Sequence, residues 1–217
     1  SLAITIWLPV TVRMVLDQFR YEISERANAT PLVLGAKGSR IDLALHALYF
    51  DTLPPADTTM AEAESINELS SESAPAISIP LHVRHRTQSR PGIEGSAIVG
   101  TSPEYFEFRD LHISHGRMIS LLGECIVGSN VARRMQLSPG DSLLSAPRNA
   151  FSLAGDYPLR MKVAGVLAQA HSPDDDAVFT DVRTTWVIDG IGHGHQELNT
   201  QTDSNLLLKR DAATGAI

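Results

Sequence analysis

The chain has 217 residues, which is enough for one large domain or two small lobes. Its hydrophobic fraction of 43% supports a buried core, whereas its formal net charge of -7 argues against a general nucleic-acid binder. The lysines and arginines are scattered, although phosphate contacts require them to be clustered. Cys125 is the only cysteine, so no internal disulfide can form, and its apolar neighbours predict a buried thiol.

The amino end opens with an apolar run, residues 2–12, that gives way to charged residues. A membrane-spanning helix needs about 20 apolar residues, so this run is predicted to be the last turns of a membrane helix whose beginning is absent. Val12, Val15, Leu16 and Phe19 follow at helical spacings, which predicts an amphipathic stalk helix that leaves the membrane. An ordinary core helix is the alternative.

The next segment is predicted to contain a strand at residues 32–34, a turn at 35–39 and a short helix at 41–50. The turn, Gly-Ala-Lys-Gly-Ser, invites comparison with a phosphate-binding loop. That loop requires four residues between its glycines and a lysine directly after the second glycine. Lys37 instead precedes the second glycine, so nucleotide binding is not expected here.

Residues 53–76 are the least apolar stretch, and they are predicted to be a linker with a short helix at residues 60–69. Residues 77–86 alternate apolar and polar side chains, which predicts a half-exposed strand. The region from Gly95 to Val166 then reads as strand, turn, short helix, strand, helix, turn, strand and strand. The chain has neither the nucleophile elbow of the α/β-hydrolases nor the paired-histidine helix of zinc proteases.

Several short motifs follow one another in this region. They are Val99-Gly100-Thr101-Ser102-Pro103 with Tyr105-Phe106, Gly116-Arg117, Ile126-Val127-Gly128, Leu137-Ser138-Pro139-Gly140-Asp141, and the strand from Lys162 to Leu167. Their order resembles the extracytoplasmic domain of ABC transporter permeases of the MacB and FtsX type, a class that includes the lipoprotein-release permeases. The resemblance covers most of the chain, from about Leu32 to Ile188.

The resemblance implies an α+β fold of mixed short strands and helices, arranged as a two-lobed periplasmic domain behind an N-terminal stalk helix. Residues 1–27 would be the end of a membrane helix and the stalk. Residues 28–90 together with 158–217 would form a first, porter-like lobe, and residues 91–157 would form an inserted second lobe. A doubly wound sheet is not expected, because regular alternation of strands and helices is missing.

The resemblance also implies a function without chemistry. The chain would be the periplasmic domain of a permease in the bacterial inner membrane, and it would couple ATP hydrolysis in the cytoplasm to movement or cargo handling outside. Its expected partners are a cytoplasmic ABC ATPase subunit, a second permease subunit in a homodimer or heterodimer, and a lipid, a lipoprotein or a periplasmic adaptor. No nucleic acid, cofactor or enzymatic activity is expected.

Two alternatives remain open at this point. The first is a module that binds lipid or lipoprotein cargo, with an apolar groove lined by Tyr105, Phe106 and Phe108. Burial in the core is the competing interpretation for these aromatic side chains. The second alternative is a metal-dependent hydrolase that uses paired histidines.

Three close histidine pairs bear on that second alternative: His82 and His85, His112 and His115, and His193 and His195. In a regular strand, residues three apart face opposite sides, so the first pair is not expected to share a metal. The last pair could bind one with Asp189 or Glu197, but a surface loop is favoured and no metal site is predicted. The acidic run at residues 174–176 lacks calcium-loop spacing and is predicted to be a solvated turn.

Overall fold

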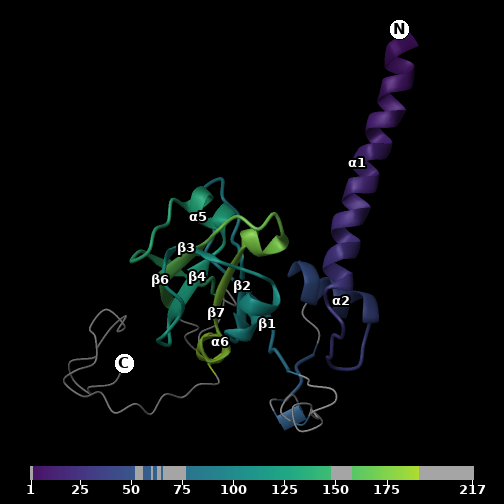
Figure 1. Cartoon of the computed structure of the whole chain (residues 1–217). Helices are drawn as coiled ribbons and strands as arrows, with labels where there is room; N and C mark the ends of the chain where they lie inside the picture. Colours follow the sequence, from purple (N-terminus) through teal and green to yellow (C-terminus); the bar gives the residue numbers. More distant parts are fainter. Residues whose placement is uncertain are drawn as a thin grey trace, which may run out of the picture. The chain divides into compact units, whose positions relative to one another are not determined.

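The computed structural model describes residues 2–51, 56–59, 61–62, 65, 77–147 and 158–190 of the chain. It divides the chain into two compact units, Ser1–Thr58 and Thr59–Ile217 (Figure 1). The predicted helix at residues 60–69 lies mostly outside the described residues.

In its described part, the first unit has two helices, α1 (Leu2–Asn28) and α2 (Arg40–Tyr49). The helix predicted from the amino-terminal pattern is confirmed by α1, which runs for 27 residues and contains Pro9. The helix predicted at residues 41–50 is likewise confirmed by α2. The side chain of Ser39 caps α2 by accepting a hydrogen bond from the backbone N–H of Asp42 at 3.2 Å.

The strand predicted at residues 32–34 is wrong, because these residues have irregular backbone. Leu32 and Leu34 are both exposed, and no described strand of the first unit pairs with this segment. A single extended segment has no ladder to stabilise it, so three apolar residues are not sufficient to make a strand.

The second unit is built on a mixed sheet. In the described residues its strands are β1 (His82–Arg86), β2 (Ala97–Thr101), β3 (Ile113–Gly116), β4 (Glu124–Val127), β5 (Ser142–Leu144), β6 (Arg160–Leu167) and β7 (Ala177–Asp181). The order across the sheet is β1-β2-β7-β4-β6-β3, and β5 also pairs with β6. In the described residues from 77 onward, the helices are α4 (Glu104–Phe108), α5 (Ser129–Met135), the 3-10 helix η1 (Pro173–Asp176) and α6 (Val182–Ile188).

Parallel and antiparallel pairs are combined in this sheet. β2 pairs with β7 and β4 with β6 in parallel, whereas the neighbours β4 and β7 are antiparallel. The α+β class predicted from the sequence is therefore confirmed, as is the strand predicted from Lys162 to Leu167. The predicted order of elements lacks one strand, because both β3 and β4 lie between α4 and α5.

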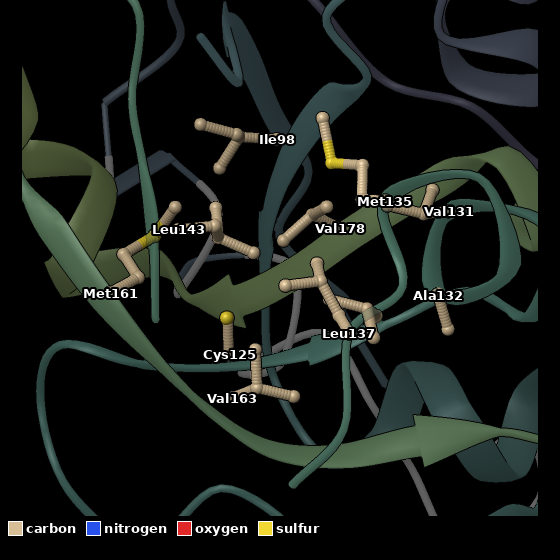
Figure 2. Packing of buried hydrophobic residues seen from close by; sticks show 11 residues of the cluster. Ile98, Cys125, Val131, Ala132, Met135, Leu137, Leu143, Met161, Val163 and Val178 are labelled. Carbon is tan, nitrogen blue, oxygen red and sulfur yellow. The ribbon is translucent and has the colours of Figure 1, made fainter. Parts of the chain in front are cut away.

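One face of the sheet carries the main apolar core (Figure 2). Its buried members come from the strands, from α5 and from the turn after α5: Ile98, Cys125, Val127, Val131, Ala132, Met135, Leu137, Leu143, Met161, Val163 and Val178. The prediction of a buried Cys125 thiol is confirmed. Burial raises the pKa of this thiol, because the thiolate would lose its hydration in apolar surroundings.

The opposite face is covered by α4. Val99 and Phe179 follow Ile98 and Val178 in their strands, so their side chains point to the other side of the sheet. Tyr105 and Phe106 of α4 each place their ring centroid 5.5 Å from that of Phe179. The sheet is thus buried on both faces in its middle, which explains why β2 and β4 are buried at every position and are mostly apolar.

Strands from both predicted lobes share this sheet. β1, β6 and β7 belong to the segments predicted as the first lobe, and β2 to β5 belong to the segment predicted as the inserted lobe. The division into a lobe of residues 28–90 with 158–217 and a lobe of residues 91–157 stays a prediction.

Candidate functional site

The residues predicted to form the stalk lie in α1. Val12, Val15 and Leu16 are exposed there, and the side chain of Phe19 lies outside the described part of the chain. Arg13 and Asp17 form an ion pair at 3.9 Å on the same helix. Among the described residues, no helix combines the length and the hydropathy needed to cross a bilayer.

The three aromatic residues predicted to contact cargo are placed differently. Tyr105 and Phe106 are buried in the core, and the Tyr105 hydroxyl donates a hydrogen bond of 2.7 Å to Asp174. Phe108 is exposed at the end of α4, where the guanidinium of Arg109 lies 4.7 Å from its ring centroid. Of the three rings, only that of Phe108 is available at the surface for a cargo or an interface.

An apolar surface that sequence reasoning missed lies between β3 and β4, in the segment of residues 117–123, called here the 117–123 loop. Met118, Leu121 and Leu122 are exposed in this loop, and the side chain of Leu121 is 65% exposed. Exposed leucines next to one another mark contact surfaces more often than isolated ones do. The sequence signal is the mostly apolar segment of residues 118–122. The structure gives this segment neither a helix nor a strand.

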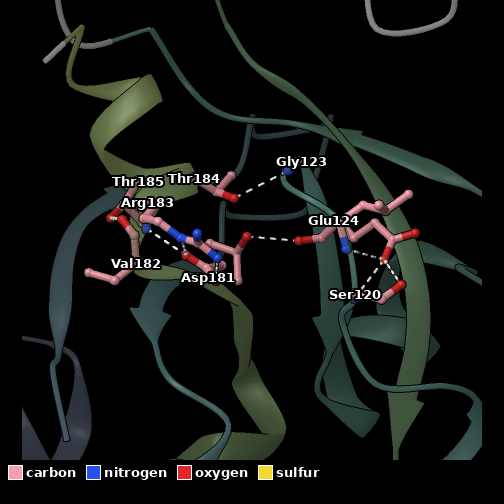
Figure 3. A network of polar contacts seen from close by, with 10 residues as sticks. Ser120, Gly123, Glu124, Asp181, Val182, Arg183, Thr184 and Thr185 are labelled. Carbon is pink, nitrogen blue, oxygen red and sulfur yellow. Dashed lines mark hydrogen bonds and ion pairs between the residues drawn. The ribbon is translucent and has the colours of Figure 1, made fainter. Parts of the chain in front are cut away.

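The 117–123 loop is held in one shape by Glu124 (Figure 3). Arg117 donates to both carboxylate oxygens of Glu124, with 2.8 Å for the Nη1 contact. The backbone N–H groups of Ser120 and Leu121 donate to the same carboxylate at 3.0 and 3.2 Å. These hydrogen bonds, chiefly those from Arg117, lower the pKa of Glu124 to about 2.

A second set of contacts ties the loop to the rest of the unit. The N–H of Gly123 donates to the hydroxyl of Thr184 in α6 at 3.2 Å, and its carbonyl accepts from the N–H of Lys162 in β6 at 2.8 Å. The Thr180 hydroxyl donates to the carbonyl of Glu124 at 2.8 Å. These contacts fix the position of the loop on the sheet.

The prediction that residues 174–176 form a solvated turn is wrong for two of the three carboxylates. Asp174 and Asp175 are buried in η1. Asp175 accepts hydrogen bonds from the backbone N–H groups of Ala170 and His171 and from the Ser129 hydroxyl, at 2.8 to 3.0 Å. These carboxylates are used to hold η1 against α4 and α5, a role that depends on contacts distant in sequence.

The expectation that His82 and His85 face opposite sides is also wrong. His82 lies opposite Gly100 and His85 opposite Ile98, so three steps along β1 match only two steps along β2. This irregularity is a β-bulge, and it turns both histidines to the same face, because Gly100 and Ile98 are two residues apart.

Asp189, at the end of α6, meets both histidines. Its two carboxylate oxygens lie 3.1 Å from the Nε2 atoms of His82 and His85, one oxygen to each ring. His112 and His115 are exposed in or beside β3. His193 and His195 lie outside the described residues.

Comparison with known protein families identifies the family of the chain. Residues 2–214 match the family described as the MacB-like periplasmic core domain. The chain belongs to this family, so it is a periplasmic domain of the kind found in MacB-like ABC transporter permeases. Comparison with curated proteins gives no match.

Two solved structures are similar to the chain. The crystal structure of the periplasmic region of MacB from Actinobacillus actinomycetemcomitans is 11% identical, with a TM-score of 0.48, over 71% of this chain and 65% of that chain. The extracellular domain of the noncanonic ABC-type transporter YknZ from Gram-positive bacteria is 16% identical, with a TM-score of 0.48, over 73% of this chain and 76% of that chain. The chain thus spans just under two thirds of the MacB region.

Proposed function

We propose that this domain transmits movement between the membrane part of a permease and its extracytoplasmic side, driven by ATP hydrolysis in the cytoplasm. The observation that carries the proposal is α1, a continuous helix of 27 residues at the start of a domain of this family. A helix is stiff over this length, so a displacement at one end is passed to the other. Its exposed Val12, Val15 and Leu16 offer an apolar surface to neighbouring helices.

The proposal includes partners and a location. A periplasmic domain of this family implies an inner-membrane permease that works with a cytoplasmic ABC ATPase and pairs with a second permease subunit. We place contacts with an adaptor or a cargo at exposed apolar side chains, namely Phe108 and the leucines of the 117–123 loop. Lipid or lipoprotein handling is the finer form of this proposal. It has less support than the coupling role, because Tyr105 and Phe106 fill the core.

The location is tested by labelling in the full-length permease. Glu107→Cys puts a thiol at an exposed position, whereas the native Cys125 is buried and is expected not to react. With any other cysteines of the full-length protein replaced, we expect a membrane-impermeant maleimide to label Glu107→Cys from the outside of the inner membrane. Labelling only after the membrane is opened would place the domain on the cytoplasmic side and refute the proposed location.

The coupling role is tested by breaking α1. Leu16→Pro removes one helical hydrogen bond and introduces a clash, which costs about 3 kcal/mol in a helix interior. We expect this variant to retain ATP hydrolysis by the added ATPase subunit but to lose any nucleotide-dependent change in the labelling rate at Glu107→Cys. Leu16→Ala, which keeps the helix, is the matched control. An unchanged nucleotide response in Leu16→Pro would count against a stalk in α1.

A further inference from the structure

We infer that His82, His85 and Asp189 form a binding site for a divalent transition-metal ion of the zinc type. The three side chains come from two elements, since both histidines lie in β1 and Asp189 directly follows α6. One ligand atom from each lies within 4.8 Å of the other two. The site differs from the pair His193 and His195, which sequence reasoning considered for a metal.

The separations match those of ligands that share one ion. Zinc in proteins lies about 2.0–2.2 Å from imidazole nitrogen and carboxylate oxygen in a tetrahedral arrangement, which sets neighbouring ligand atoms about 3.3 Å apart. The two distances from Nε2 of histidine to a carboxylate oxygen of Asp189 are both 3.1 Å. These two distances involve different oxygens of the carboxylate, and all three ligand atoms lie within 4.8 Å of one another, so side-chain rotations can bring the three groups around one ion.

The kind of ion follows from the ligand atoms. Imidazole nitrogen suits zinc and its neighbours among the first-row transition metals, whereas calcium and magnesium prefer sites made of oxygen. Two nitrogens and one carboxylate leave a further coordination position for water or another donor.

The three side chains are largely buried, unlike those of an ordinary surface cluster. The side chains of His82, His85 and Asp189 are 14%, 2% and 5% exposed. A carboxylate withdrawn from water to this extent needs strong charge compensation, which a doubly charged ion in contact with all three groups supplies. His82 is the most exposed of the three.

The β-bulge in β1 brings the two histidines to the same face of the sheet. Without the extra residue in β1, His82 and His85 would project from opposite faces, and α6 covers only one of them. Gly100, which pairs with His82, lies directly against α6, since a Cβ at this position would come within 2.6 Å of Thr185. The bulge therefore turns both imidazoles toward the helix whose end carries Asp189.

The inference is tested by metal binding to the whole chain. Metal-free protein is titrated with zinc alone near neutral pH, and bound metal is measured by elemental analysis after removal of excess ion. Cobalt is used in parallel, because its visible spectrum reports nitrogen and oxygen coordination directly. We expect about one equivalent of tightly held zinc per chain and an increase in the thermal unfolding midpoint, because binding to the folded state alone stabilises it.

Variants assign the binding to these side chains. His82→Ala carries the least risk to folding because His82 is partly exposed, and Asp189→Asn keeps the size of the side chain. Each is expected to lose the tightly bound equivalent and the zinc-dependent shift in midpoint, with folding checked by circular dichroism. His115→Ala, at an exposed histidine outside the cluster, is the matched control and should retain both.

Two outcomes would overturn the inference. One is a wild-type chain that binds no zinc, which would leave only the His-Asp-His contacts. The other is binding that survives in a folded His82→Ala variant and in Asp189→Asn. In that case, loss of binding in the double variant His193→Ala and His195→Ala would move the site to residues outside the cluster.

Discussion

At the scale of single residues, three buried carboxylates connect separate segments of the second unit through hydrogen bonds and ion pairs. Glu124 fixes the 117–123 loop, Asp175 fixes η1, and Asp189 meets two histidines. Each accepts contacts from residues that lie in other turns or strands. A buried carboxylate that loses such contacts retains the full cost of leaving water. Loss of these contacts is therefore expected to lower the free energy of unfolding substantially.

The first prediction concerns Glu124→Gln. The neutral amide cannot accept the charged contacts of Arg117 equally well, so we expect the free energy of unfolding to fall by about 1.5–3 kcal/mol, the range for hydrogen bonds to charged groups. Urea unfolding at neutral pH measures the change. Glu107→Gln, at an exposed position in α4, is the control and should stay within about 0.5 kcal/mol of the wild type. Equal effects of the two variants would contradict the holding role.

A second prediction follows from the pKa of Glu124. The folded-state pKa of about 2 lies below the ordinary value of 4.5, so the unfolded chain binds this proton first as the pH falls. The stabilisation by Glu124 is therefore complete above about pH 5 and is lost progressively toward about pH 2. We expect the difference in unfolding free energy between the wild type and Glu124→Gln to shrink over this window. A difference that does not depend on pH would show that the ionised carboxylate is not its source.

Individual residues also show which features of the fold and the candidate site could be predicted from the sequence. The burial of Cys125 followed from its apolar neighbours, and Arg117 was noticed as part of a motif. Its partner Glu124 could not be found, because nothing in a local pattern marks which acid a given arginine will meet. The prediction that His82 and His85 face opposite sides was wrong for a similar reason, because a bulge depends on how β1 pairs with β2.

At the scale of elements, helices with local signals were predicted well and strands less so. α2 has a serine cap, which marks its start in the sequence, whereas α5 begins after Gly128 without a side-chain cap. The strand at residues 32–34 was predicted wrongly, and the region between α4 and α5 was given one strand instead of two. Strand formation is settled by partners elsewhere in the chain, and here those partners are distant.

A third prediction concerns the packing of η1 against the start of α5. A Cβ placed on Gly128 would lie 2.4 Å from the backbone carbonyl oxygens of both Asp174 and Asp175. Backbone atoms cannot rotate away, so Gly128→Ala is expected to destabilise the fold by about 1–3 kcal/mol in thermal or urea unfolding. Gly38→Ala, where a Cβ meets open space, is the control and should have little effect. A neutral Gly128→Ala would mean that η1 moves at low cost.

At the scale of the whole molecule, the second unit depends on one sheet whose strands come from most of its length. β7 lies between β2 and β4, although it is the last of the described strands in sequence. Family membership and the α+β class could both be predicted, because the order of short motifs is a sequence property. The strand order could not, because a nearly uniform apolar strand pairs equally well with several neighbours.

A fourth prediction follows from this arrangement. A fragment of residues 77–190 contains every described strand and is expected to fold cooperatively without the first unit. A fragment of residues 77–176 lacks β7 and α6, and it should remain unfolded because the sheet is left without a central strand. Circular dichroism with thermal unfolding distinguishes the two. An unfolded 77–190 fragment would show that residues outside it are needed for the fold.

The central position of β7 also bears on how such a domain is made. A chain that is exported from its amino end delivers β1 to β6 before the strand that joins β2 to β4 has crossed the membrane. Until then the two halves of the sheet expose apolar faces and unpaired edges, which are the features that cause aggregation. We therefore expect newly exported chains to spend their most vulnerable period waiting for residues 177–181, and periplasmic chaperones to act on them during that interval.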